Sequence, residues 1–115
     1  MGRLTTHVLD TAAGKPAVGL KLVLSRLDGA PVVLAEATTN SDGRLDRPLL
    51  DGTAFAPGCY EIMFYVGDYF RGTGAGVAEP AFLDLVPLRF GIAEDAHYHV
   101  PLLVSPYAYS TYRGS

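Results

Sequence analysis

The sequence predicts an all-β fold in which two sheets pack face to face as a β-sandwich. Thirteen glycines and eight prolines interrupt short apolar runs along the 115 residues. Turn residues that recur roughly every ten positions are typical of short strands joined by tight connections. The spacing does not resemble helices alternating with strands, so we expect at most one short helix.

The first half of the chain predicts four strands. Apolar and polar residues alternate in residues 4–9 and most clearly in residues 18–25, as expected for strands with one buried face. Asp28-Gly29 and the Asn-Ser-Asp-Gly run at residues 40–43 are turn motifs that separate the next strands. The predicted strands are residues 4–9, 18–25, 32–39 and 44–50.

The second half predicts four more strands around one irregular region. Residues 69–85 contain three glycines and Pro80, which favours irregular structure with one helical turn. Ser105-Pro106 separates the last two strands, which leaves no room for a crossover helix between them. The predicted strands are residues 59–66, 86–92, 97–104 and 107–113.

Length and composition limit the classes of function. A chain of 115 residues is expected to form one domain, residues 1–115. Twelve acidic against nine basic residues give a net charge of −3, so nucleic acid is not an expected partner. No apolar run approaches a membrane span or a leader peptide, so we expect no membrane contact and a cytoplasmic location.

The balance of apolar and charged residues predicts association between subunits. Hydrophobic residues make up 49% of the chain and charged residues only 18%. So low a charge content leaves apolar surface for another subunit to cover. We therefore expect an oligomer.

Metal sites and a serine nucleophile are both disfavoured. His97 and His99 have a spacing that could chelate zinc, but a third and a fourth ligand are lacking. Asp42-Gly43 lacks the other acidic ligands of a calcium loop. Ser115 has no nucleophile-elbow motif around it. We therefore expect no metal site.

The residues with the most useful chemistry are two histidines, one arginine and the chain end. A histidine near its ordinary pKa can act as general base toward water, and a guanidinium can stabilise an oxyanion. His7, Arg44 and His99 supply these groups. Residues 109–115 alternate aromatic and hydroxyl side chains and then end in Arg-Gly-Ser, which is unusual because chain ends rarely carry ordered polar groups.

Taken together, these motifs closely resemble the 5-hydroxyisourate hydrolases, which are also called transthyretin-related proteins. The resemblance rests on Leu-Thr-Thr-His-Val-Leu-Asp at residues 4–10, Thr-Asn-Ser-Asp-Gly-Arg at residues 39–44 and His-Tyr-His-Val-Pro at residues 97–101. Tyr-Arg-Gly-Ser at residues 112–115 is the most discriminating element, because it distinguishes these enzymes from the hormone-carrying transthyretins. The resemblance covers nearly the whole chain.

The resemblance implies a transthyretin-like, or prealbumin-like, sandwich of two four-stranded sheets that assembles as a homotetramer, with active sites between subunits. It implies hydrolysis of 5-hydroxyisourate to 2-oxo-4-hydroxy-4-carboxy-5-ureidoimidazoline in urate degradation, without a cofactor. His7 or His99 would deprotonate water, and His97 would lie next to these histidines without contacting the substrate. The implied catalytic residues are His7, Arg44, His99 and Ser115, and the implied substrate-binding residues are His7, Arg44 and Tyr112.

Two other functions remain open at this point. A transthyretin-like carrier would bind an apolar aromatic ligand in a channel that lacks the histidine and arginine set. An interaction module of the prealbumin type would need only the turn motifs and would remain a monomer.

Overall fold

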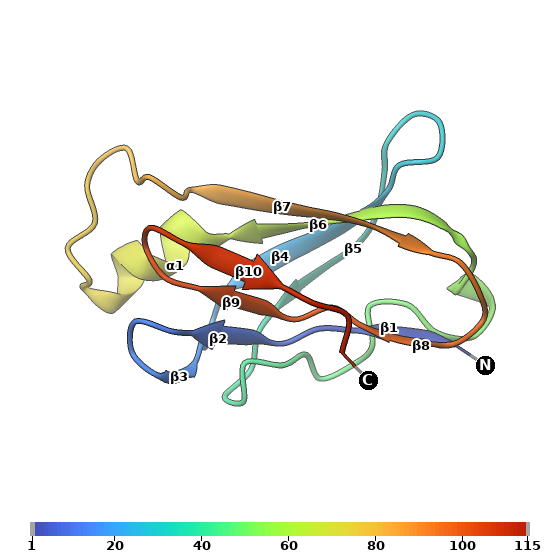
Figure 1. The fold of residues 1–115 in the computed structure, drawn as a ribbon, viewed down its shortest axis with the longest axis horizontal. Coiled ribbons are helices and arrows are strands. Elements are labelled where there is room, and N and C mark those ends of the chain that lie inside the picture. The colour runs from blue at the N-terminus through green and yellow to red at the C-terminus, as the bar shows by residue number, and fades with distance from the viewer. Residues whose placement is uncertain (1, 115) are drawn as a thin grey trace.

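The computed structural model describes residues 2–114, which form a β-sandwich (Figure 1). The strands of the first sheet are β4 (Lys21–Arg26), β5 (Val32–Thr38), β6 (Gly58–Tyr65) and β7 (Leu85–Ile92). Their order in the sheet is β5, β4, β6, β7, and all neighbouring strands are antiparallel.

The remaining strands are β1 (Arg3–Thr5), β2 (Val8–Asp10), β3 (Lys15–Pro16), β8 (His97–His99), β9 (Leu102–Val104) and β10 (Tyr109–Thr111). The second sheet has the order β10, β9, β2, β3, and its central pair, β2 with β9, is parallel. A further parallel pair joins β1 to β8. The backbone N–H of Val100 donates to the carbonyl of Thr5, and that of Leu102 donates to the carbonyl of His7 (2.9 Å each), so the two parallel pairs form one continuous ladder.

The predicted sandwich of two four-stranded sheets is therefore confirmed, with the β1/β8 pair as an addition. Alternate residues of the central strands form its core. Leu22 and Leu24 of β4 and Ile62 and Phe64 of β6 are fully buried. Burying a side chain of this size stabilises the fold by about 1.5–3 kcal/mol. The strands are thus rigid supports for the side chains on their other faces.

The strand predicted at residues 4–9 is interrupted between β1 and β2, but its alternation continues through the break. Thr6 is buried, and its hydroxyl donates to the carbonyl of Val100 (2.6 Å). This bond satisfies a polar group that would otherwise be costly to bury. Thr5 and His7, on either side, are half-buried on the opposite face.

The strand predicted to begin at Arg44 is absent, and this prediction is wrong. Residues 44 and 50 each pair with the segment 4–9 at a single bridge, Arg44 with His7 and Leu50 with Leu4. Pro48 has no N–H to donate to a ladder, which disfavours regular pairing between the two bridges. The chain between them instead forms one wall of a cavity.

One helix follows β6 directly: α1 (Val66–Thr73). Its buried residues Val66, Tyr69 and Phe70 have helical spacing, and the Tyr69 hydroxyl donates to Oδ2 of Asp10 (2.8 Å). Within residues 2–114 this is the one α-helix, beside a three-residue 3₁₀ helix at Gly52–Ala54, and it begins where a strand end had been predicted. No helix within residues 2–114 has the length and apolar character needed to cross a membrane.

Candidate active site

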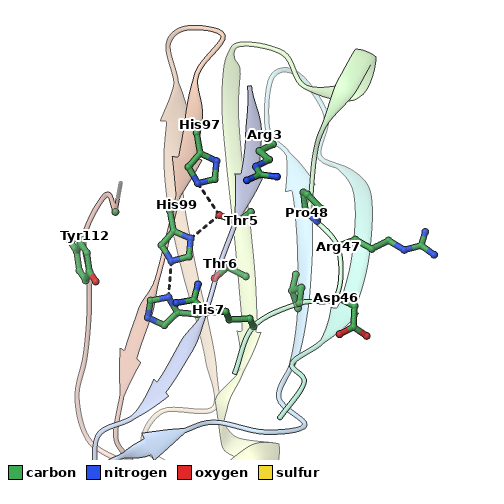
Figure 2. A pocket seen from close by; sticks show the side chains of 13 residues that line it. Arg3, Thr5, Thr6, His7, Asp46, Arg47, Pro48, His97, His99 and Tyr112 are labelled. Carbon is green, nitrogen blue, oxygen red and sulfur yellow. Dashed lines mark hydrogen bonds between the residues drawn. The ribbon is translucent and has the colours of Figure 1, made fainter. Parts of the chain in front are cut away.

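A cavity of about 510 Å³ opens beside the β1/β8 pair (Figure 2). Parts of the chain that are far apart in sequence form its walls. They are the start of the chain, the segment after the turn at residues 40–43, strand β8 and the residues after β10. The lining side chains and backbone used below belong to Thr5, His7, Arg44, His97, His99, Tyr112 and Gly114.

Three imidazole rings stand in a row along this cavity (Figure 2). His97 and His99 lie two positions apart in β8 and therefore point to the same side. Nδ1 of His7 lies 2.6 Å from Nε2 of His99, and the centroids of these two rings are 4.8 Å apart. One of these nitrogens donates and the other accepts, so His7 and His99 form a hydrogen-bonded pair.

A threonine hydroxyl occupies the other side of His99. Oγ1 of Thr5 lies 2.7 Å from Nδ1 of His99 and 3.5 Å from Nε2 of His97. Both ring nitrogens of His99 are therefore engaged. Among the described residues, none forms a hydrogen bond with Nε2 of His7, so this nitrogen can meet a ligand.

Burial and neighbouring charge keep both paired rings neutral near pH 7. Desolvation is the main cause that lowers the pKa of His7, and the positive charge of Arg44 adds to it. Desolvation also lowers the pKa of His99 to about 4, with further contributions from His7, Arg44 and His97. A neutral imidazole has one nitrogen lone pair, which is what a general base needs.

The turn before Arg44 brings this residue to the cavity. Oδ1 of Asn40 accepts a hydrogen bond from the backbone N–H of Arg44 (3.2 Å). Gly43 has φ +70°, and a Cβ there would lie 2.5 Å from the carbonyl oxygen of Val8, so only glycine fits. This close approach places Arg44 opposite His7. Within residues 2–114 no carboxylate pairs with the Arg44 guanidinium, whose donors can therefore serve an anion.

The end of the described chain forms the last wall. The backbone N–H of Gly114 donates to the carbonyl of His99 (2.7 Å). The guanidinium of Arg113 lies over the ring of Tyr98, 4.0 Å from its centroid, a cation–π contact that holds this segment against β8. Tyr112 lines the cavity and is 56% exposed. The segment after β10 is thus fixed at several points.

The cavity brings together four of the predicted site residues, namely His7, Arg44, His99 and Tyr112. Ser115 lies outside the described residues. Thr5 was not predicted, although it shares a face with His7 two positions later, and that parity could have identified it. Residues 2–114 contain no group of three or more His, Cys, Asp or Glu side chains arranged to hold a metal ion.

A model of the HIUase/Transthyretin family matches residues 4–114. The chain belongs to this family. The match includes every cavity residue described above, and it confirms the resemblance that the motifs had indicated.

Two relatives of this HIUase/Transthyretin family member are named as 5-hydroxyisourate hydrolases. The chain is 65% identical to 5-hydroxyisourate hydrolase 2 of Rhizobium meliloti (strain 1021), over 99% of this chain and 97% of the relative. It is 64% identical to 5-hydroxyisourate hydrolase of Mesorhizobium japonicum, over 99% of this chain and 93% of the relative.

Solved structures of similar proteins share the fold. A (S)-allantoin synthase is 50% identical with a TM-score of 0.94 over 99% of this chain, which spans only 44% of that protein's chain. Klebsiella pneumoniae 5-hydroxyisourate hydrolase is 34% identical with a TM-score of 0.83, and the match covers both chains completely. Sea bream transthyretin in complex with thyroxine is 26% identical with a TM-score of 0.86, over 97% of this chain and 94% of the other.

Proposed function

We propose that this chain is a 5-hydroxyisourate hydrolase, which converts 5-hydroxyisourate to 2-oxo-4-hydroxy-4-carboxy-5-ureidoimidazoline in urate (purine) degradation. Three relatives of that name are 60–65% identical over nearly its whole length. The observation that carries the proposal is the hydrogen-bonded pair of His7 and His99, whose Nδ1 and Nε2 atoms lie 2.6 Å apart in a cavity that Arg44 also lines.

The reaction requires water to attack a ring carbonyl. Nε2 of His7 takes a proton from the water, whose oxygen bonds to the carbonyl carbon. The carbonyl oxygen becomes an oxyanion, which the Arg44 guanidinium stabilises by charge-assisted hydrogen bonds. The ring C–N bond then breaks, the proton held by His7 passes to the leaving nitrogen, and the carbonyl becomes a carboxyl group.

The two paired histidines have different roles in this proposal. His7 acts on water because its Nε2 has no partner among the described residues. His99 uses one nitrogen for His7 and the other for Thr5, so it orients His7 and stabilises the imidazolium that forms. His7 and Arg44 also bind the substrate, since both contact the reacting group.

The chain end is proposed to complete the site. Tyr112 offers a hydroxyl and a ring face at the edge of the cavity, both suited to a planar polar substrate. Ser115 is proposed to act on the substrate or on a catalytic histidine, through its hydroxyl or its terminal carboxylate. Retention of full activity after removal of residues 112–115 would contradict both assignments.

We also propose that the active form is a homotetramer with sites at the subunit interfaces. β7 and β10 are edge strands, so each offers unpaired backbone groups to a neighbouring subunit. Light scattering should give a mass about four times the 12.2 kDa of one chain, and a monomer mass would reject this assembly. The single chain also exposes large hydrophobic side chains that a neighbouring subunit would cover, namely Val18, Val32, Val33, Leu34, Phe82, Leu85, Tyr107, Tyr109 and Tyr112.

The activity is tested by following the ultraviolet absorbance of 5-hydroxyisourate generated from urate by urate oxidase. The protein should accelerate the decay of this compound, and EDTA should leave the rate unchanged because the proposed steps use no metal or cofactor. Unchanged decay would reject the hydrolase, and thyroxine binding without hydrolysis would favour a carrier. A cytoplasmic location is part of the proposal and is tested by cell fractionation.

The pH profile should reflect the lowered pKa values of the paired histidines. Protonation removes the lone pair of the base, and a lowered pKa moves this loss to lower pH. We expect the acid limb of kcat/KM to be centred below about 6.5, where an ordinary histidine is half protonated. Rates between pH 5 and 8, corrected for spontaneous decay, test this. An acid limb centred at or above about 6.5 would contradict it.

Gly114→Ala should reduce activity more than stability. A Cβ at this position would lie 2.7 Å from Cδ2 of His99, so the ring must move. Because Nε2 of this ring forms the 2.6 Å hydrogen bond with Nδ1 of His7, we expect kcat to fall by about tenfold or more, as is typical when a catalytic group is misplaced. The melting temperature should change little, since the contact lies after β10 and outside both four-stranded sheets. Gly72→Ala, which meets no atom within 4 Å, is the control.

A further inference from the structure

The hydroxyl of Thr5 lies between two imidazoles, and the fold does not require it there. Thr5 pairs with His99 in the β1/β8 register, and the backbone N–H of Val100 donates to the carbonyl of Thr5 (2.9 Å). These backbone contacts hold the two strands together without the side chain. The hydroxyl nevertheless makes a short contact, 2.7 Å, with Nδ1 of His99.

The contacts of this hydroxyl couple it to His7. A hydroxyl has one proton, so it donates to one neighbour and accepts from another. If Nδ1 of His99 carries a proton and donates to Thr5, Nε2 of His99 has a lone pair and accepts from Nδ1–H of His7. His7 then presents a lone pair at Nε2. If Thr5 instead donates to His99, each bond reverses, and Nε2 of His7 carries the proton.

The direction of this chain of hydrogen bonds therefore decides whether His7 is ready to act as a base. The proton of Thr5 can be directed toward Nε2 of His97, 3.5 Å away. His97 is exposed, and Thr5 lies between this outer ring and the inner pair of rings (Figure 2).

We propose that Thr5 is a positioning residue that accepts a hydrogen bond from Nδ1–H of His99 and so keeps Nε2 of His7 unprotonated. This inference rests on the proposed hydrolase, because it assigns Thr5 to the base of that reaction. Thr5 does not touch the substrate in this scheme. It acts through His99, and its loss should affect the chemical step and leave substrate binding intact.

The first test needs no variant. Nitrogen-15 NMR of the histidine rings at pH 7 distinguishes a protonated from an unprotonated ring nitrogen. We expect Nδ1 of both His99 and His7 to carry the proton in the free protein. A spectrum in which Nε2 of His99 is protonated would overturn the proposal. This measurement does not depend on activity, so it separates failure of this inference from failure of the proposed function.

The second test compares two substitutions of Thr5. Thr5→Val preserves the shape of the side chain and removes the hydroxyl, and we expect kcat to fall by about tenfold, as for the loss of one hydrogen bond. KM should change less than twofold, and the His99 ring should shift toward the Nε2-protonated form. Thr5→Ser restores the hydroxyl and should recover most of kcat.

A control distinguishes this role from a general loss of a hydroxyl hydrogen bond. Thr11 also donates through Oγ1, to the carbonyl of Val104 (3.1 Å), and it does not line the cavity. Thr11→Val should retain the wild-type kcat and histidine tautomers. Equal activity of wild type, Thr5→Val and Thr11→Val would overturn the proposal. So would a Thr5→Ser variant as impaired as Thr5→Val but equally well folded.

Discussion

His7→Asn should lower kcat for 5-hydroxyisourate hydrolysis by about 10²–10⁴-fold, the usual contribution of a general base. Asparagine has an amide N–H near the position of Nδ1 and can still donate to His99. It has no group at the position of Nε2. The substitution therefore removes the proton acceptor and leaves the partner ring with its hydrogen bond, which isolates the proposed catalytic nitrogen.

The comparison variant is His97→Asn, which removes an exposed ring from the same cavity. The loss of kcat there should be less than about tenfold, because the His97 ring reaches Thr5 only at 3.5 Å and its centroid lies 6.5 Å from that of the His99 ring. Steady-state rates at saturating substrate, with circular dichroism to confirm folding, provide the measurement. Similar losses in both variants would contradict the assignment of the base to His7.

Local sequence patterns predict which residues share a face. The alternation over residues 4–9 places Thr5 and His7 together, and the spacing in β8 places His97 beside His99. The parallel pairing of β1 with β8, 94 positions apart, brings these two faces into contact. No local pattern encodes that pairing, and the resemblance to a known family implied only that His7 and His99 belong to one site.

Two elements were misjudged because long-range contacts determine them. The alternation of the β6 segment continues to Val66, but this residue begins α1, which a hydrogen bond from Tyr69 to Asp10 ties to β2. The turn before Arg44 was predicted, but the strand predicted after it is absent, and the position of Arg44 depends on the close approach of Gly43 to the Val8 carbonyl. Neither partner lies within the window of residues that defines a turn or a strand.

Arg44→Gln should lower kcat by about 10²–10³-fold, the effect of removing one donor to an oxyanion. It should also move the acid limb of the pH profile upward. The positive charge of Arg44 lowers the pKa values of His7 and His99, so its loss allows both to rise toward the ordinary value. The base is then protonated, and inactive, over a wider range of pH.

Arg44→Lys separates these two contributions. Lysine retains the positive charge, so the acid limb should stay near its wild-type position, but an ammonium cannot form the paired hydrogen bonds of a guanidinium. We therefore expect a reduced kcat with a wild-type pH profile. Lys21→Gln, which removes one positive charge outside the cavity lining, should change neither quantity. If Arg44→Gln and Arg44→Lys shift the acid limb equally, charge is not the means by which Arg44 acts on the histidines, and its role reduces to hydrogen bonding.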